Sequence, residues 1–340
     1  MTRTFIGAVK QHIQRLPLAW FFPIYCLWFW LDTGRSADRL RKRLGIPLLS
    51  GTDLFAAKTS DTVFILGSGR SINEITAAQW EVIKSHDTIA LNNWPVHPFV
   101  PTFYCYESAV NEPGLDEAYN FLLNNICNRA SDYRPTIKII ANFKRAERPQ
   151  IGKDLTHECK HNLYFVYTPV VIARTPEEFR AMVRFYRRLG LFAISPKIRN
   201  LFKYSSVLST CLSLAIRLGY RKIVLCGVDL KTSEYFYQDS EQFPRTSSVS
   251  LRPRDETHDT AIAKPWLVPM DEMLSIIREE ILEPAGVELL VASTHSLLHP
   301  RIPSAQSLFA VLRQEKHPPG KFVSVSGEAG LSGNSDRVNV

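Results

Sequence analysis

The sequence of 340 residues lacks paired cysteines, and this absence argues against two kinds of scaffold. No two of its six cysteines form a CxxC pair, which disfavours a structural zinc site. Cys105 and Cys226 fall inside predicted buried strands, where cysteine behaves as a small hydrophobic residue. The pattern predicts a protein of a reducing compartment rather than one held together by disulfides.

Several ligand-binding signatures are also missing. The sequence has no Walker motif, and the dinucleotide pattern GxGxxG would need a third glycine where Ile72 stands, which disfavours NAD. No DxD pair accompanies Asp229, so nothing supports metal dependence. No RNA- or DNA-binding signature accompanies the formal charge of +8, so we expect no nucleic-acid partner. The charge favours anionic small molecules, acidic glycans or anionic lipid, although an ordinary basic protein is the simplest interpretation.

The apolar stretch LPLAWFFPIYCLWFWL, residues 16–31, is shorter than a comfortable membrane span of about 20 residues. Pro17 and Pro23 interrupt it, basic residues flank it on both sides, and no clear cleavage site follows it. Its Trp and Tyr content and basic flanks predict that residues 1–50 form a membrane-associated segment, peripheral or monotopic, with 16–43 at the membrane surface. We expect it on the cytoplasmic side of the inner membrane, in line with the reducing compartment that the cysteines indicate. A hydrophobic hairpin packed on its own domain is the alternative.

Between residues 51 and 316 the sequence alternates between predicted strands and helices. The expected strands cover 62–67, 87–93, 102–107, 136–142, 222–229 and 288–294. The expected helices cover 76–86, 115–126, 176–190, 206–219 and 270–282, the first opened by a capping box of Thr76 and Gln79. This pattern predicts an α/β fold, a Rossmann-like, mostly parallel sheet with helices on both faces. The polar stretch 231–264 is typical of a lid, and residues 317–340 are predicted to be disordered.

In such a sheet, ligands bind at the carboxyl ends of the strands, and the first strand ends in a glycine-rich turn, GSGRS. Gly67 and Gly69 allow a sharp turn and close approach to a ligand, and the helix after Ser71 can direct N–H groups at an anion. Ser68 and Arg70 complete this candidate phosphate site. On spacing alone, a phosphate site and a plain strand–helix turn are about equally favoured.

Polar side chains recur where other strands end and helices begin. Asn92 and Asn93 end the second strand and could hydrogen-bond a ribose, base or phosphate, although a turn-capping asparagine is the commoner case. Ser205 and Ser206 open a buried helix whose N-terminus would face a ligand.

Gly227 and Asp229 end the strand that follows, and Lys231 and Tyr235 lie in the loop beyond it. Cationic or phenolic groups at this place could stabilise the charge on a departing phosphate. The alternative is that they are ordinary exposed loop residues.

Two histidines complete the set of candidate site residues. His258, in the stretch RDETHDT, could act as a general base oriented by a neighbouring carboxylate of Asp255, Glu256 or Asp259. A lone histidine in a loop is more often simply exposed. His295 and Ser296 end the last strand, where a capping turn is the alternative.

Taken in order, these pieces resemble glycosyltransferase family 42, the bacterial sialyltransferases. The family's GxGPS turn corresponds to GSGRS, its strand-ending asparagine to Asn92, and its loop histidine to His258. Its helix–ALGY–strand–SGID block corresponds to SSVLSTCLSLAIRLGYRKIVLCGVD, the most specific part of the resemblance, and its NSLL to HSLL. The resemblance covers roughly residues 62–300.

The chain departs from the family pattern in three places. Arg70 replaces the proline of GxGPS. The family's FYNPS is FYCYES, so Cys105 replaces its asparagine, with Tyr106 and Glu107 as candidate substitutes. The two tyrosines that follow the GID in the family correspond to Lys231 and Tyr235. The donor sugar and the acceptor are therefore left open.

The resemblance implies a variant of the GT-A fold and an inverting, metal-independent glycosyltransferase for cell-surface glycan biosynthesis. It implies transfer of sialic acid or a similar keto-sugar from a CMP-sugar donor to a glycan or glycolipid acceptor, with no other cofactor. In that reading His258 is the general base, Lys231 and Tyr235 stabilise the leaving phosphate, and the glycine turn and Asn92 hold the nucleotide.

Two other functions stay open at this point. A pterin diphosphokinase-like enzyme would share the glycine turn and the late GxD strand, and it would use ATP and magnesium. A non-catalytic, membrane-bound module that binds nucleotide-sugars would fit the missing FYNPS asparagine. The oligomeric state is also left open.

Overall fold

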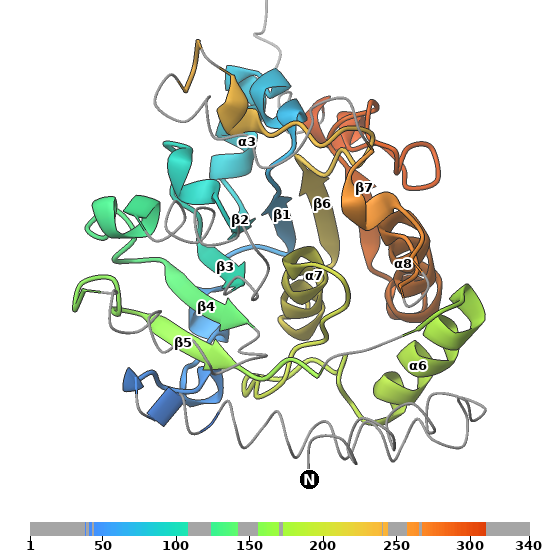
Figure 1. The fold of residues 1–340 in the computed structure, drawn as a ribbon, viewed down its shortest axis with the longest axis horizontal. Coiled ribbons are helices and arrows are strands. Elements are labelled where there is room, and N and C mark those ends of the chain that lie inside the picture. Colours follow the sequence, from blue (N-terminus) through green and yellow to red (C-terminus); the bar gives the residue numbers. More distant parts are fainter. Residues whose placement is uncertain are drawn as a thin grey trace, which may run out of the picture.

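The computed structural model describes residues 38, 41–42, 44–107, 124–141, 156–169, 173–239, 241–243, 257–264 and 267–310. Their centre is a seven-stranded sheet in the order β5-β4-β3-β2-β1-β6-β7 (Figure 1). Every pair of neighbouring strands is parallel. The strands are β1 Thr62–Leu66, β2 Asp87–Leu91, β3 Phe103–Glu107, β4 Ile137–Ala141, β5 Leu163–Val166, β6 Lys222–Cys226 and β7 Glu288–Val291. The Rossmann-like α/β fold expected from the sequence is confirmed.

The strands are nearly continuous apolar runs because both faces of the sheet are covered. In β1, Val63 and Ile65 belong to one hydrophobic core and Phe64 and Leu66 to the other, and all four are fully buried. The side chains of a strand alternate between the faces, so such a strand needs apolar residues at every buried position, here the four after Thr62.

Helices lie on both faces of the described sheet. The first face carries α6 Pro176–Arg188, α7 Val207–Arg217 and α8 Met270–Ile277, and the second carries α3 Ala77–Lys84 (Figure 1). The capping box of Thr76 and Gln79 is present at the start of α3. The expected helix 270–282 ends as α8 at Ile277 and continues as a π-helical turn, Arg278–Leu282.

Some sequence predictions concern residues that the structure does not describe. The segment 16–31, the region 317–340, most of the expected helix 115–126 and residues 244–256 of the expected lid lie outside the described residues. Within the part that is described, no helix is both long enough and apolar enough to cross a membrane.

The strand β5 was missing from the sequence prediction. It has only four residues, LYFV, and it forms one edge of the sheet beside β4. Its aromatic and β-branched content is a strand signal, but a run this short between polar residues is weak evidence for any element.

The LGY block before β6 has a structural role at the amino edge of the sheet. Gly219 adopts a left-handed conformation, φ 71°, at the end of α7. The Tyr220 hydroxyl then donates to the buried carboxylate of Asp87, 2.9 Å away, at the start of β2. The same carboxylate accepts hydrogen bonds from the backbone N–H groups of Thr59 and Ser60. This block therefore fixes α7 and β6 against β2.

An ion-pair network joins α6 to the π-helical turn, and it makes stability depend on pH. Hydrogen bonds from Arg184 and Arg180 lower the pKa of Glu280 from 4.5 to about 2. A lowered carboxylate pKa stabilises the fold fully above the unfolded value and loses this contribution as pH falls from about 4.5 toward about 2.

We therefore expect Glu280→Gln to lower the free energy of unfolding at pH 7 by about 1–2 kcal/mol. Solvent screening at the half-exposed Arg184 keeps the effect this small. Urea unfolding at pH 7 and pH 3 should show the difference from wild type shrinking at the lower pH. Glu279→Gln, which removes a more exposed partner of Arg180, is the matched control. An equal difference at both pH values would contradict the assignment.

Candidate functional site

A cavity of about 240 Å³ opens at the carboxyl edge of the sheet. The chain fills the sheet from β1 to β5 on one side and then places β6 on the other side of β1, so β1 and β6 flank a topological switch point. Crevices outside such points are the usual ligand sites of open α/β sheets. The lining residues are Gly67, Ser68, Gly69, Leu91, Asn92, Ser206, Val207, Leu208, Gly227, Val228, Asp229, Leu230, Thr232, Glu234, Tyr235, His258, Thr260 and Met270.

The glycine turn lines the cavity, but two of its backbone N–H groups bond to the protein's own backbone. Gly67 N–H donates to Cys226 O at 2.7 Å, and Gly69 N–H donates to Gly227 O at 2.8 Å. A Cβ on Gly67 would overlap the carbonyl oxygen of Gly227. These glycines are therefore required because two backbone loops touch, and their two N–H groups are not available to a phosphate.

Asp229 occupies the position at which the sequence suggested a ligand anion. Its carboxylate accepts hydrogen bonds from the backbone N–H of Ser71, at 2.9 Å, and from the Ser71 hydroxyl. A Cβ on Gly69 would lie 2.5 Å from the Asp229 Oδ2. The expectation that the turn after Ser71 directs its N–H groups at a ligand is wrong for Ser71, because a carboxylate of the protein takes that place.

The helix N-terminus that faces the cavity belongs to α7. Ser206, Val207 and Leu208 line the cavity, and the Ser206 hydroxyl caps the helix by accepting from Leu208 N–H at 3.2 Å. The N-terminal end of a helix of this length carries partial positive charge. Ser205, with φ 60°, makes the turn into the helix and is not among the lining residues.

The two asparagines after β2 have different roles. Asn92 lines the cavity in a left-handed conformation, φ 46°, and its backbone is held between Cys105 and Tyr104. Asn93 does not line the cavity, because its amide donates to the Tyr237 hydroxyl at 2.9 Å. Asn92 is therefore the residue of this pair that can reach a ligand.

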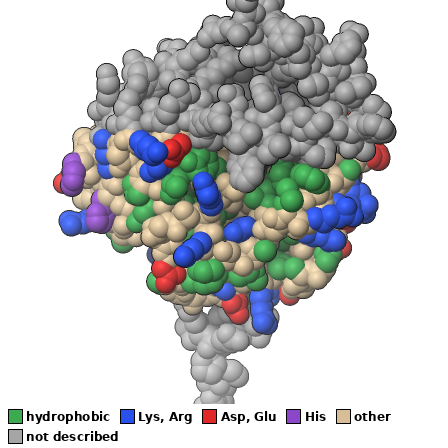
Figure 2. Space-filling view, turned by 90° about the horizontal axis from the view of Figure 1, so that it is seen from below, with side chains coloured by type: hydrophobic (Ala, Val, Ile, Leu, Met, Phe, Trp, Pro, Cys, Tyr) green, Lys and Arg blue, Asp and Glu red, His purple; other side chains and the backbone are tan. Residues whose placement is uncertain are grey.

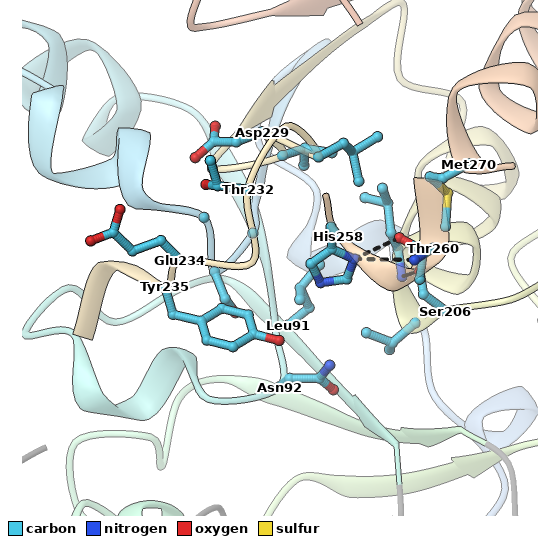
Figure 3. A pocket seen from close by; sticks show the side chains of 18 residues that line it. Leu91, Asn92, Ser206, Asp229, Thr232, Glu234, Tyr235, His258, Thr260 and Met270 are labelled. Carbon is cyan, nitrogen blue, oxygen red and sulfur yellow. Dashed lines mark hydrogen bonds between the residues drawn. The ribbon is translucent and has the colours of Figure 1, made fainter. Parts of the chain in front are cut away.

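His258 lies in the cavity with Asn92 and Tyr235 around the same space (Figure 3). Its backbone N–H donates to Leu230 O, which fixes it to the end of the β6 loop. The imidazole Nδ1 accepts a hydrogen bond from the Thr260 backbone N–H at 3.3 Å and lies 2.9 Å from the Thr260 hydroxyl. Among the described residues, Thr260 is therefore a group that can orient the ring. Asp259 instead pairs with Lys264, and Asp255 and Glu256 lie outside the described residues.

The loop after β6 places one of its two predicted residues, Tyr235, at the cavity and not the other, Lys231. Tyr235 lines the cavity, with its ring stacked on Tyr237 and perpendicular to His258. Lys231 is exposed and does not line it, because Leu230 adopts a left-handed conformation, φ 62°, that redirects the chain, and Thr232 lines the cavity instead.

Arg70 is also absent from the lining residues, although its partner Glu234 is one of them. Its guanidinium pairs with the Glu234 carboxylate at 2.9 Å, and its side chain is largely exposed. No Lys or Arg is among the described residues that line the cavity.

The HSLL turn, residues 295–298, contacts the backbone of the GVD segment, residues 227–229. The buried Ser296 hydroxyl donates to Val228 O at 2.6 Å, and Leu297 N–H donates to Asp229 O at 2.8 Å. His295 is exposed and, like Ser296, is not a lining residue. This turn therefore positions the GVD segment rather than reaching the cavity.

The candidate substitutes for the family's FYNPS asparagine do not reach the cavity either. Cys105 is fully buried within β3, and neither it nor Tyr106 or Glu107 is among the lining residues. Glu107 forms an ion pair with the buried Lys203, which lies just before α7. Burial lowers the pKa of Lys203, and the nearby Glu107 partly offsets this.

Sequence reasoning missed Thr232, Glu234 and Thr260 among the polar lining residues. Thr260 carried a usable signal, since a polar side chain two residues from a histidine can share a turn with it. Within the described ranges, no group of three His, Cys, Asp or Glu residues is arranged to hold a metal ion.

Comparisons with known proteins add little to this picture. No protein family and no curated protein matches the chain. Among solved structures, the MAf glycosyltransferase from Magnetospirillum magneticum AMB-1 is similar, with 15% sequence identity and a TM-score of 0.39. The match covers 72% of this chain. It spans about a third, 33%, of that structure's chain. Similarity at this level carries no argument about function.

Proposed function

We propose that this chain is an inverting, metal-independent glycosyltransferase that moves an acidic sugar from a CMP-sugar donor to a glycan or glycolipid acceptor. The observation that carries the proposal is the meeting of the Gly67–Gly69 turn, Asn92, the N-terminus of α7 and His258 around one cavity. These residues come from distant parts of the sequence, and they follow the order of the motifs that resemble glycosyltransferase family 42.

The size of the cavity favours a donor with a single phosphate, although its charged lining residues are the carboxylates Asp229 and Glu234. Its volume of about 240 Å³ lies just below the usual range for small-molecule sites, roughly 300–1,000 Å³, so it suits one nucleotide better than a dinucleotide. With no Lys or Arg among the described lining residues, the partial positive charge at the start of α7 is the group best placed to meet one phosphate.

His258 would remove the proton from the acceptor hydroxyl. A neutral imidazole that accepts a proton at Nε2 carries its own proton on Nδ1. In this structure Nδ1 accepts the Thr260 backbone N–H at 3.3 Å, so the step requires the other tautomer, in which Nδ1–H donates to the Thr260 hydroxyl 2.9 Å away and continues to do so once the ring is positively charged. Thr260 is therefore a positioning residue for this step.

Tyr235 would stabilise the departing phosphate by donating its phenolic hydrogen as negative charge develops. The acceptor oxygen attacks the anomeric carbon on the face opposite the leaving nucleotide, through a transition state with oxocarbenium character. One bond forms to the acceptor oxygen and one breaks to the phosphate oxygen, so the configuration of the sugar inverts.

Nucleotide binding gives a direct test. A ligand that binds only the folded chain stabilises it by about 2.7 kcal/mol at ~100 times its dissociation constant. In a thermal-shift panel of CMP, UDP, GDP and ATP, we expect CMP to stabilise the chain most. Stabilisation by ATP with magnesium, and not by CMP, would favour the diphosphokinase-like alternative. CMP binding without turnover of any CMP-sugar would favour the non-catalytic module.

A pair of glycine substitutions shows whether CMP occupies this cavity. Asn92→Gly keeps the left-handed backbone and removes the amide, so we expect CMP to bind about two- to tenfold more weakly, the worth of one neutral hydrogen bond. Asn162→Gly is the matched control, because Asn162 has φ 51° and precedes β5 at the far edge of the sheet. Equal CMP affinity in both variants would place the nucleotide elsewhere.

A further inference from the structure

The connection between α6 and α7 exposes aliphatic side chains within a run of basic residues. Leu189 is 65% exposed and Ile194 is 66% exposed, the highest values among the large hydrophobic residues that the structure describes. Both lie in residues 187–199, RRLGLFAISPKIR, which contain four basic residues and no acidic one. We name residues 187–199 the basic–apolar loop.

The conformation of this loop is held by the protein. The guanidinium of Arg217, at the end of α7, donates to Gly190 O at 2.9 Å and to Leu191 O at 3.1 Å. Ser195 N–H donates back to Arg217 O at 3.1 Å. Leu191 and Phe192 are buried in the core, so the loop is anchored between its two exposed aliphatic residues.

The positive charge of the loop is largely uncompensated. The Glu280 carboxylate pairs with Arg180 and Arg184, while Arg187 donates only to the Glu280 backbone carbonyl. Within the described part of the chain, neither Arg188 nor Lys197 forms an ion pair. Seen from below, Lys and Arg side chains gather on the side of the molecule where α6 lies, next to hydrophobic side chains (Figure 2).

We propose that the basic–apolar loop docks on the surface of an anionic phospholipid bilayer. The exposed Leu189 and Ile194 would enter the interfacial region, and the basic side chains would meet the lipid phosphates. Exposed aliphatic residues alone would suit many partners, but their combination with uncompensated positive charge matches the apolar and anionic layers of a bilayer surface. This contact is distinct from the one predicted for residues 16–43.

The position of the loop is compatible with catalysis on the bound protein. The loop contacts the C-terminal end of α7, and β6 begins shortly afterwards at Lys222, so it lies at the amino edge of the sheet. The cavity lies at the carboxyl edge, where β6 ends. A bilayer at the loop therefore leaves the mouth of the cavity uncovered.

Measuring how much of the full chain binds to vesicles would not test the proposal, because other segments can also hold the chain there. Hydrogen–deuterium exchange does test it, because it shows which segment is protected. We expect slower exchange in peptides that cover 187–199 when vesicles of phosphatidylserine and phosphatidylcholine are added, and no change with phosphatidylcholine alone. Leu189→Ser combined with Ile194→Ser should abolish this protection. Arg188→Gln should weaken partition of the loop about fivefold, the worth of one basic residue near an anionic surface.

Ile262→Ser is the matched control, because Ile262 is also an exposed aliphatic residue, 45% exposed, but follows the turn that carries His258. It should leave the vesicle-dependent protection of 187–199 intact. Unchanged exchange in 187–199 while the chain is on anionic vesicles would overturn the proposal. Protection that rises with protein concentration alone would indicate a second copy of the chain instead, and equal protection by polyglutamate would indicate an acidic protein. CMP binding, measured in the same variants, tests the proposed function independently of the loop.

Discussion

Replacing His258 with alanine is expected to lower the turnover of sugar transfer by about two to four orders of magnitude, the usual contribution of a general base. The imidazole lines the cavity and contacts Thr260 at Nδ1, so its loss would remove the proposed proton acceptor without opening the core. Transfer from CMP-sugars to glycan acceptors gives the rate, and a thermal shift with CMP shows that the nucleotide still binds.

Thr260 provides the control that separates orientation from folding. Thr260→Val keeps the shape of the side chain and removes the hydroxyl, so we expect kcat to fall while KM for the donor stays nearly constant. Thr260→Ser restores the hydroxyl and should recover most of the rate, which a purely structural role would not predict. Normal transfer by the His258→Ala variant would rule out the assignment of the base.

Replacing Gly67 with alanine is expected to cause the largest loss of stability, about 3 kcal/mol, the upper range for overpacking of a tight contact. The added Cβ would overlap the Gly227 carbonyl oxygen and would lie 3.1 Å from the Cys226 carbonyl oxygen. Both are backbone atoms at the end of a central strand, so neither can move aside cheaply. The free energy of unfolding in urea measures the loss.

Gly51→Ala is the matched control for this substitution. A Cβ on Gly51 would meet no atom within 4 Å, and its backbone is not left-handed. We expect its stability to change by less than about 1 kcal/mol, in the stabilising direction. Equal stability of the Gly67 and Gly51 variants would mean that the two loops do not touch as described.

Much of the fold could be predicted because buried parallel strands leave a simple trace in the sequence. In runs such as TVFIL and KIVLC the four buried residues after the first must be apolar to face two cores, and that requirement is visible without coordinates. The capping box of α3 was visible for a similar reason, since both of its partners lie within one turn. The four-residue edge strand β5 left too short a trace.

The general position of the site was also predictable, because parallel strands place their carboxyl ends on one edge. The roles of individual polar residues were not predictable, because they depend on partners far along the chain. Ser71 is separated from Asp229 by 158 positions, and Ser296 from Val228 by 68, yet each pair is joined by a hydrogen bond. Lys231 was misplaced because a left-handed backbone at Leu230, a residue other than glycine, is not visible in the sequence.

For the proposed glycolipid acceptor and the proposed membrane contact, the height of the sheet would set a minimum reach. β1 and β6 each have five residues, so the amino and carboxyl edges lie about 17 Å apart. With lipid bound at the amino edge, the reacting hydroxyl of an acceptor rooted in that same leaflet has to stand at least this far above the headgroups. Glycolipids with short glycans would not reach the cavity. The length of the glycan would then select the acceptor without any specific contact to its sugars.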